Sequence, residues 1–354
     1  MDTMLAGRLN LATGSFAVTG VPVPEPGPGE LLIEVKAAGV CLSDVHLIDR
    51  TLRPVFNPNN EVTLGHEVAG IVFRLGSNLK RPWKPGARVV LLGGEPCGTC
   101  DACWRHAPCL VPRTRGADFD GGWAQYAVAR EECVYAIPDH LPFEQAAIIP
   151  DAVSTPYAAV VATAGVRPAQ AVGIWGAGGL GVHAISVARL VGAEPIIAID
   201  PLTDALERTL SYGADVALQP EDPNFHEKLM EATRGQGLDV AFDFAGVPTA
   251  REQAATSLAR NGVLVLVGIA AQPFAIADDA VFNYSGNEVR GHYGSTPAHL
   301  EELIRLTSAG RLDLTASVSE RLPLSQASEA VAHLAHKSGS PVRIVLTPAH
   351  RAGA

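Results

Sequence analysis

The 354-residue sequence has little of what several protein classes require. Its six cysteines are too few for a disulfide-held scaffold, and no run of 18 apolar residues predicts a membrane span. Basic residues number only 27 against 37 acidic ones, which gives a formal charge of −10. This balance argues against a polyanion-binding surface, so neither nucleic acid nor membrane is an expected partner. Residues 1–14 lack the basic and apolar parts of a signal peptide, and we expect a cytoplasmic protein.

The composition that is present indicates a globular chain. Apolar residues make up 47% and charged residues 18% of the sequence. At about 150 residues per domain, the length predicts two domains with hydrophobic cores. Residues 1 to about 150 are rich in glycine, proline and short β-branched runs, which is typical of an irregular antiparallel β domain.

From residue 153 to 292 the pattern changes to short apolar strands that alternate with helical segments. This alternation predicts an α/β fold with a doubly wound parallel sheet covered on both faces. Predicted strands are 171–175, 195–199, 216–218, 239–244 and 263–268, and predicted helices include 182–190 and 203–211. A further helix at 298–309 and a closing strand at 342–346 follow.

A glycine-rich turn follows the first of these strands. Gly176-Ala177-Gly178-Gly179-Leu180-Gly181 fits G-x-G-x-x-G and leads directly into a helix. The first glycine allows the tight turn, the second lets a pyrophosphate approach the backbone, and the third allows close packing of helix on strand. The helix N-terminus then offers unpaired N–H groups to the anion. The turn predicts a dinucleotide site, although glycine-rich turns are common without one.

Asp200 strengthens this prediction, because it ends the next strand 19 residues after the last glycine of the turn. A carboxylate at this place can accept hydrogen bonds from both ribose hydroxyls and repels a 2′-phosphate. The following residues 201–203 contain no Arg or Lys, so NAD is favoured over NADP. The alternative is that Asp200 is a turn or helix N-cap residue.

Four cysteines lie within 13 residues: Cys97, Cys100, Cys103 and Cys109. Four thiolates can hold a tetrahedral zinc ion, and such a closed shell leaves no position for water or substrate. We therefore predict a structural zinc site. Free buried cysteines and an iron–sulfur cluster are the alternatives.

Cys41, His66 with Glu67, and Asp151 are dispersed, and taken singly each is more typical of packing than of metal binding. Together with Gly65-His66-Glu67, the cysteine cluster, the glycine turn and the stretch Asp120-Gly121-Gly122-Trp123-Ala124-Gln125-Tyr126, they resemble the zinc-dependent medium-chain alcohol dehydrogenases. The resemblance covers essentially the whole chain.

The resemblance implies a Rossmann domain inserted in a GroES-like, β-rich catalytic domain. The expected parts are 1–152 for the first catalytic segment, with a zinc lobe at about 93–112, then 153–292 for the Rossmann domain and 293–354 for the second catalytic segment. The implied activity is hydride transfer between an alcohol and NAD, through a zinc-bound alkoxide, which gives an aldehyde or ketone.

Carried over residue by residue, the resemblance implies that Cys41, His66 and Asp151 bind a catalytic zinc. Asp151 stands where many members have cysteine, and one thiolate, one carboxylate and one imidazole keep the zinc formally neutral. Glu67 resembles the carboxylate beside the metal, and Asp44 the acid that orients the histidine ligand.

The remaining implied roles concern protons and cofactor. Ser43 and His46 match the relay that carries the substrate proton to solvent. Thr155 resembles the hydroxyl beneath the nicotinamide, Gly268 the backbone at the carboxamide, and Arg343 the arginine that pairs with the pyrophosphate, with a surface arginine as its alternative.

The resemblance further implies two zinc ions per chain, a small alcohol or carbonyl substrate, and a homodimer or homotetramer that pairs through strands near 263–268 and 288–293. It has one departure: five residues separate Cys103 from Cys109, where the family usually has seven.

Two other functions remain possible. A zinc-free reductase of the same superfamily would act on enoyl or quinone substrates, and the set of Cys41, His66 and Asp151 argues against it. A non-catalytic protein that senses nucleotide state would bind NAD without turnover. Metal content and the NADH absorbance distinguish these functions from an alcohol dehydrogenase.

Overall fold

The chain forms two compact units in the computed structural model, which describes residues 2–54, 57, 59–105, 109–270 and 272–350. Met1–Asp151 and Leu300–Ala354 form one compact unit, here the split unit, and Ala152–His299 form the inserted unit. The first boundary lies one residue before the predicted 152, and the second lies at 299 rather than 292.

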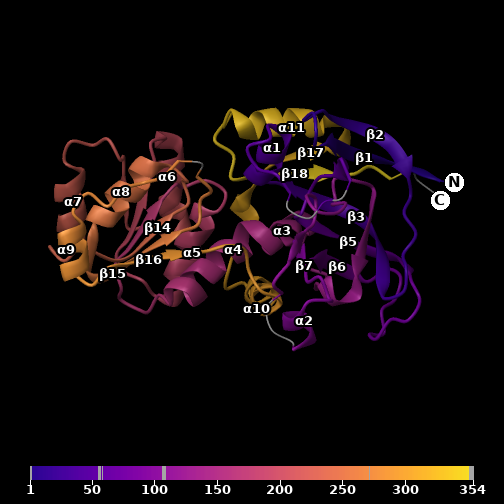
Figure 1. The fold of residues 1–354 in the computed structure, drawn as a ribbon, viewed down its shortest axis with the longest axis horizontal. Coiled ribbons are helices and arrows are strands. Elements are labelled where there is room, and N and C mark those ends of the chain that lie inside the picture. The colour runs from indigo at the N-terminus through magenta and orange to yellow at the C-terminus, as the bar shows by residue number, and fades with distance from the viewer. Residues whose placement is uncertain (1, 55–56, 58, 106–108, 271, 351–354) are drawn as a thin grey trace. The chain divides into compact units, whose positions relative to one another are not determined.

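The inserted unit is built on a six-stranded sheet in the order β13-β12-β11-β14-β15-β16, and all neighbouring strands are parallel (Figure 1). Its strands are β11 (Val172–Trp175), β12 (Ile196–Ile199), β13 (Val216–Leu218), β14 (Leu238–Asp243), β15 (Leu258–Leu266) and β16 (Glu288–Gly291). This order confirms the predicted doubly wound fold. It also corrects one expectation: β15 is paired on both sides, so only β16 of the two named strands can meet another subunit.

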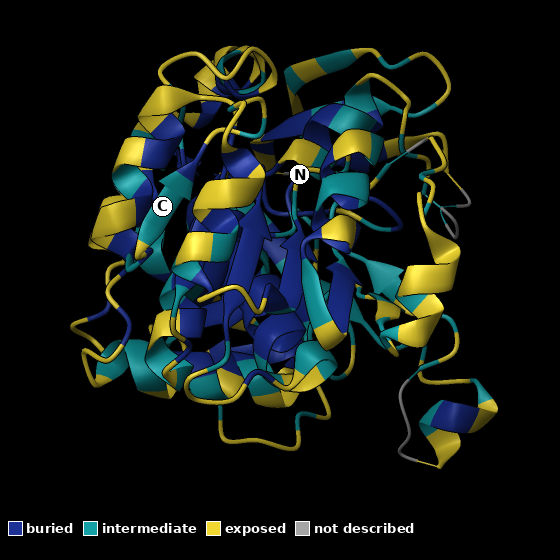
Figure 2. Cartoon of the chain, turned by 90° about the vertical axis from the view of Figure 1, so that its left-hand side faces the viewer, coloured by how far each residue is buried: buried dark blue, intermediate teal, exposed yellow. Residues whose placement is uncertain are grey.

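Helices cover the sheet because every residue of the central strands β11 and β12 is buried. They are α4 (Ser154–Ala158), α5 (Gly181–Val191), α6 (Thr203–Tyr212), α7 (Phe225–Ala232), α8 (Pro248–Thr256) and α9 (Asp279–Tyr284), and α10 (Pro297–Ser308) runs across the boundary. Figure 2 shows the buried strands in dark blue behind helices with exposed, yellow outer faces. Both α5 and α6 end at a left-handed glycine, Gly192 or Gly213.

The split unit contains a seven-stranded sheet in the order β10-β6-β5-β3-β18-β17, with β9 also paired to β3. Its strands are β3 (Glu30–Val40), β5 (Val68–Leu75), β6 (Arg88–Leu91), β9 (Tyr126–Arg130), β10 (Val134–Ala136), β17 (Val318–Pro323) and β18 (Arg343–Thr347). The long β3 brings β18 beside the N-terminal strands, because Ile344 pairs with Val40. The closing strand of the chain therefore lies next to the residue that precedes Cys41.

Two small sheets complete the split unit: β2-β1-β4, from β1 (Thr3–Asn10), β2 (Phe16–Pro22) and β4 (Glu61–Thr63), and the pair β7 (Gly94–Glu95) with β8 (Arg113–Thr114). Its helices are α1 (Leu42–Ile48), α2 (Asp101–Trp104), α3 (Phe143–Ile148) and α11 (Ala327–Ala335), with shorter turns η1 (Glu131–Cys133), η4 (Thr315–Ser317) and η5 (Leu324–Gln326). Leu9, Leu31, Val68 and Trp123 are fully buried in its core. This β-rich unit agrees with the predicted catalytic domain.

One described helical segment, Phe143–Ala164, is long and apolar enough to cross a membrane by composition alone. It runs from α3 through η2 (Ile149–Val153) and α4 to η3 (Ala159–Ala164). Because 78% of its apolar window is buried within the protein, its apolar character is explained by packing.

Candidate functional site

Three dispersed residues of the split unit meet at one point. The Sγ atom of Cys41, which directly follows β3, lies 3.4 Å from Oδ2 of Asp151, and Nε2 of His66 lies 3.3 Å from the same oxygen. With Glu67, these residues place one ligand atom each within 4.8 Å of all the others. The structure therefore brings together the residues that the resemblance implied.

The spacing of these atoms fits a zinc ion. In a tetrahedral site, zinc–ligand distances of about 2.0–2.3 Å separate a sulfur from an oxygen by about 3.6 Å and a nitrogen from an oxygen by about 3.4 Å. The observed distances of 3.4 and 3.3 Å are close to these values. One thiolate, one imidazole and one carboxylate also leave a fourth position for water or substrate.

Asp44 supports two of these residues at once. Its carboxylate is fully buried; Oδ2 accepts the backbone N–H of Cys41 at 2.9 Å, and Oδ1 lies 3.7 Å from Nδ1 of His66. Burial alone would lower the pKa of His66, but Asp44 and Asp151 together raise it well above its usual value. Asp44 thus lies where the sequence predicted an acid that orients the histidine.

Glu67 lies beside the cluster in a space that a glycine provides. A Cβ atom on Gly39 would lie only 1.8 Å from Oε2 of Glu67, so no larger residue fits there. Trp123 donates its indole N–H to the carbonyl of the same glycine at 2.9 Å. Burial raises the pKa of Glu67 to about 8, while the positive charge of Arg343 opposes this shift.

Arg343 was expected at the cofactor pyrophosphate or on the surface, but the structure places it beside the cluster. Only 3% of it is exposed, and its Nη2 lies 2.7 Å from Oε1 of Glu67 and 3.4 Å from Oδ2 of Asp151. The surface-arginine alternative is wrong, because β18 carries this side chain to the cluster of Cys41, His66, Glu67 and Asp151. A contact with pyrophosphate stays a prediction. The strand pattern of 342–346 gave no signal of this role, which follows from the pairing of β18 with β3.

Ser43 and His46 lie one turn apart on α1 and therefore on one face of this helix. Ser43 is half-buried, whereas the His46 side chain is 38% exposed and its Nδ1 lies 3.7 Å from Oδ2 of Asp49. Ser43 follows Cys41 by two positions and the His46 side chain is partly exposed, which is the order that a proton relay needs. Their role stays a prediction.

The four clustered cysteines also lie together. Sγ of Cys103 is 3.9 Å from that of Cys97 and 3.5 Å from that of Cys100, and Cys100 is 4.0 Å from Cys109. A tetrahedral zinc–thiolate site, with zinc–sulfur distances of about 2.3 Å, separates its sulfurs by about 3.8 Å. The shorter spacing between the last two cysteines therefore still allows this geometry.

Backbone N–H groups also point at the sulfurs of this lobe, as expected for thiolates. Cys97 and Val111 donate to Sγ of Cys109 at 3.2 and 3.3 Å, and Cys100 donates to Sγ of Cys97 at 3.3 Å. Hydrogen bonds from the backbone of Thr99, from the backbone of Cys100 and from the Thr99 hydroxyl lower the pKa of the Cys97 thiol to about 6. Residues 106–108 of the predicted lobe lie outside the described part of the chain.

In the inserted unit, the glycine-rich turn joins β11 to α5 as predicted. Gly176 has φ of +94°, and a Cβ atom on Gly181 would lie 1.7 Å from the carbonyl oxygen of Gly176. No described atom lies within 4 Å of a Cβ position on Gly178, so a ligand can approach the backbone there. Gly179 and Leu180 complete the turn before α5 begins at Gly181.

Asp200 follows β12 and is 9% exposed. Its Oδ2 accepts the N–H of Ala177 in the glycine turn at 2.8 Å, and Oδ1 accepts the N–H of Leu202 at 2.9 Å. Asp200 therefore stabilises both turns, as the alternative interpretation of the sequence had it. Each oxygen keeps a second lone pair, so a ribose contact also stays a prediction.

Two further residues that were predicted to bind the cofactor have hydrogen-bond partners inside the inserted unit. The carbonyl of Thr155 lies 3.0 Å from Nε2 of His292, whose pKa is lowered by burial. Gly268 donates its N–H to the carbonyl of Asp243 at 2.8 Å, and its own carbonyl accepts from Arg251 at 2.6 Å. The N–H of Gly268 and one lone pair of its carbonyl are therefore already used. Only the second carbonyl lone pair is left for the predicted contact with a carboxamide.

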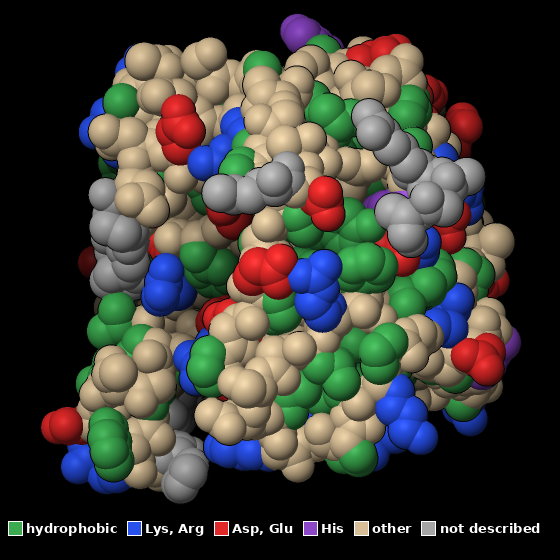
Figure 3. All heavy atoms as spheres, turned by 90° about the vertical axis from the view of Figure 1, so that its right-hand side faces the viewer, with side chains coloured by type: hydrophobic (Ala, Val, Ile, Leu, Met, Phe, Trp, Pro, Cys, Tyr) green, Lys and Arg blue, Asp and Glu red, His purple; other side chains and the backbone are tan. Residues whose placement is uncertain are grey.

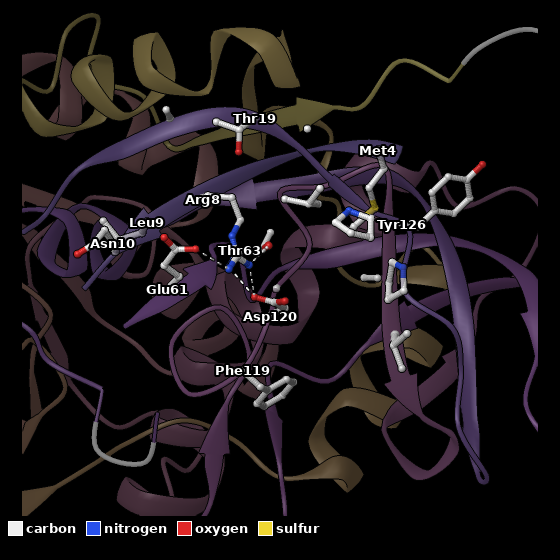
Figure 4. A pocket seen from close by; sticks show the side chains of 18 of the residues that line it. Met4, Arg8, Leu9, Asn10, Thr19, Glu61, Thr63, Phe119, Asp120 and Tyr126 are labelled. Atoms are coloured by element: carbon white, nitrogen blue, oxygen red, sulfur yellow. Dashed lines mark hydrogen bonds and ion pairs between the residues drawn. The ribbon is translucent and has the colours of Figure 1, made fainter. Parts of the chain in front are cut away.

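A groove of about 850 Å³ lies along β1, β2 and β9, and Figure 4 shows Arg8 at its centre. Nη1 of Arg8 donates to Asp120 at 2.6 Å and to Thr63 at 3.0 Å, and Nη2 lies 3.6 Å from Glu61. Asp120 of the Asp120–Tyr126 stretch therefore links β1 to β4.

On the face in Figure 3, acidic and basic side chains are interspersed with apolar ones. The predicted metal ligands do not line this groove.

Comparison with known proteins supports both units. The family described as "Alcohol dehydrogenase GroES-like domain" matches residues 27–139, and "Zinc-binding dehydrogenase" matches residues 179–309. Sorbitol dehydrogenase of Bacillus subtilis strain 168 is 29% identical over 95% of each chain. L-threonine 3-dehydrogenase of Pyrococcus abyssi is 32% identical over 85% of this chain and 86% of its own.

Among solved structures, a protein of Sinorhizobium meliloti 1021 bound to NADP is similar with a TM-score of 0.89 and 27% identity. The similarity covers 98% of this chain and 100% of that one. The likeness thus extends over both units of the fold.

Proposed function

Because the chain belongs to the zinc-dependent medium-chain dehydrogenase family, we propose that it oxidises an alcohol to an aldehyde or ketone with NAD. The substrate carbon loses a hydride to the nicotinamide, and its hydroxyl loses a proton to solvent. The observation that carries this proposal is the convergence of Cys41, His66 and Asp151 within ligand distance. A free alcohol holds its proton too tightly near pH 7 for this chemistry, so the reaction needs such a site.

Cys41, His66 and Asp151 would hold a zinc ion, whose Lewis acidity would lower the pKa of the substrate hydroxyl. The protein's own groups then handle orientation and the proton. Asp44 holds His66 from behind and fixes which ring nitrogen faces the cluster. Ser43 accepts the substrate proton while its own hydroxyl proton moves on toward the partly exposed His46, which releases a proton to water.

For the cofactor, we propose NAD rather than NADP. The Asp200 carboxyl is nearly buried beside the glycine turn, so a 2′-phosphate would meet an acidic side chain without a compensating Arg or Lys in residues 201–203. Because a similar protein has been solved with NADP bound, the preference of this protein for NAD needs a direct test. The kcat/KM values with the two cofactors, measured with one alcohol, provide that test.

We further propose that Cys97, Cys100, Cys103 and Cys109 hold a second, structural zinc ion. The support is the near-tetrahedral spacing of the sulfurs and the backbone N–H groups that point at them. Together with the first site, this predicts two zinc ions per chain.

The proposed setting is a cytoplasmic homodimer or homotetramer that acts on a small alcohol. Reduced thiols in the cysteine lobe suit this compartment. The free edge of β16, where Val289 is 39% exposed, provides a strand for pairing with a second copy.

The experiment that tests the function combines metal analysis with turnover. We expect two zinc ions per chain and NADH formation with some member of a panel of primary, secondary and cyclic alcohols. The panel includes sorbitol and L-threonine because similar proteins are named for them. Activity that survives complete chelation would support a zinc-free reductase. NAD binding without turnover on any alcohol or carbonyl would support a nucleotide-sensing protein.

A further inference from the structure

A buried ion pair lies at the carboxyl end of the inserted sheet, outside the residues that the sequence singled out. Asp243, the last residue of β14, is fully buried, and Arg251 on α8 is 8% exposed. Nε of Arg251 donates to Oδ2 of Asp243 at 2.6 Å. Burying two charges is costly unless their hydrogen bonds are satisfied, so their other contacts indicate what the pair does.

Asp243 ties the ends of two neighbouring strands together. Its Oδ1 accepts the N–H groups of Ala245 and Gly246 at 2.9 and 2.8 Å, which orders the loop after β14. Its backbone carbonyl accepts the N–H groups of Val267 and Gly268 at 2.9 and 2.8 Å, just after β15. The conformations of both loops are therefore coupled at one residue.

Arg251 also forms a direct hydrogen bond with the loop after β15. Its Nη2 donates to the carbonyl of Gly268 at 2.6 Å, and its guanidinium lies 5.8 Å from the centre of the Phe274 ring. The two loops touch backbone to backbone, because a Cβ atom on Gly268 would lie 2.4 Å from the nitrogen of Gly246. The guanidinium thus fixes the direction of the Gly268 carbonyl.

These loops adjoin the dinucleotide turn on the side opposite Asp200. A Cβ atom on Gly176 would lie 2.9 Å from the nitrogen of Ala245, so the turn and the loop after β14 are in contact. Asp200 follows β12, which pairs with the other edge of β11. A dinucleotide that crosses this point has its adenosine half toward Asp200 and its nicotinamide half toward β14 and β15.

We propose that Arg251 is a positioning residue for the nicotinamide half of the cofactor, which it serves by holding the backbone at Gly268. This inference rests on the proposed function, because it assumes that the inserted unit binds a nicotinamide dinucleotide. Arg251 does not touch the cofactor itself; it acts through the Gly268 carbonyl and the Asp243 loop. A small displacement of this backbone is enough to weaken a geometry-dependent contact.

The test compares a whole cofactor with one that lacks nicotinamide. NADH and ADP-ribose are titrated by calorimetry into the zinc-loaded wild type, Arg251→Met, Arg251→Lys and Arg260→Met. Arg260 is a matched control, since it is an exposed arginine of the same unit that lies 5.2 Å from the Tyr284 ring. Thermal unfolding of each variant is recorded alongside.

We expect Arg251→Met to weaken NADH binding about tenfold or more and ADP-ribose binding less than about twofold, because only the nicotinamide half depends on this backbone. If this variant does not fold, Arg251→Lys decides. Lysine keeps the charge, but its single ammonium nitrogen replaces the two separate nitrogens with which Arg251 reaches Asp243 and Gly268. It should show the same selective loss, smaller in size. Equal losses for both ligands, or none, would overturn the proposal. A wild type that binds neither ligand would instead contradict the proposed function.

Discussion

The guanidinium of Arg343 lies 2.7 Å from the carboxylate of Glu67, inside the cluster that also holds Cys41, His66 and Asp151. Arg343 places a positive charge beside both Glu67 and Asp151, and this charge opposes the rise in the pKa of Glu67 that burial causes. Arg343 also pairs with Glu67, and we expect this pairing to keep the carboxylate from binding a metal held by Cys41, His66 and Asp151. Removing this arginine should thus change the metal site rather than only the fold.

We expect Arg343→Met to lower kcat/KM by about 10–100-fold, the effect typical of residues behind a metal ligand. The freed Glu67 should then bind the metal, which the visible spectrum of the cobalt-substituted enzyme reports as higher coordination. The double variant Arg343→Met/Glu67→Gln should restore the wild-type spectrum.

Arg321→Met on the neighbouring β17 is the control for this series, since its side chain is 52% exposed and lies 3.6 Å from Glu144. An unchanged spectrum in Arg343→Met, combined with weaker NADH binding, would instead assign Arg343 to the pyrophosphate.

Asp151→Asn should reduce turnover strongly while NADH affinity stays within about twofold, because an amide is a weak zinc ligand and the residue does not belong to the glycine turn. Asp151→Cys should retain much more activity than Asp151→Asn, because a thiolate restores the charge of the site. Steady-state kinetics, zinc content and NADH titration check both variants. Equal activity of the two variants would contradict the assignment of Asp151 as a ligand.

Asp44→Ala removes two supports at once, the acceptor for the Cys41 N–H and the carboxylate behind His66. We expect a loss of kcat/KM of about 10–100-fold, which is typical of residues that support a metal ligand. We also expect a lower Tm, because the lost helix-capping contact should reduce the free energy of unfolding by about 1 kcal/mol. NADH binding should not change. A variant with lower Tm but full activity at 25 °C would reduce Asp44 to a structural residue.

Asp200→Asn should change the cofactor preference. The amide keeps the size of the side chain and one acceptor, but no longer repels a 2′-phosphate, so the ratio of kcat/KM for NAD over NADP should fall about tenfold or more. The control is Asp204→Asn on α6, a nearby acid outside the glycine turn. Unchanged preference in Asp200→Asn would leave this residue only its observed role in the turn.

Features that depend on local sequence were predictable. The strands of the inserted unit and the helix after Gly181 follow from apolar alternation and the glycine turn. The structure places them within two residues of the predicted positions, except that β15 begins at Leu258, five residues before the predicted 263. The four cysteines are close in sequence, so their clustering could also be expected. In contrast, the spacing of Cys41, His66 and Asp151 carries no local pattern, and only resemblance to a family brought them together.

Features that depend on tertiary pairing could not be predicted from local sequence. The pattern at 342–346 predicts a strand, but only its register against β3 turns Arg343 toward Glu67. Likewise, the apolar run at 263–268 does not say that β15 lies between β14 and β16, away from an edge. The sequence analysis did not single out Arg251, because an arginine on a helix is ordinarily exposed and only the tertiary structure shows that this one is buried against Asp243.

The most direct test of the central claim is an anomalous-scattering map at the zinc edge, from crystals of the zinc-loaded protein. The account predicts two peaks per chain: one among Cys97, Cys100, Cys103 and Cys109, and one about 2.0–2.3 Å from Cys41 Sγ, His66 Nε2 and an Asp151 oxygen. A single peak at the four cysteines, with none shared by Cys41, His66 and Asp151, would contradict the proposed catalysis.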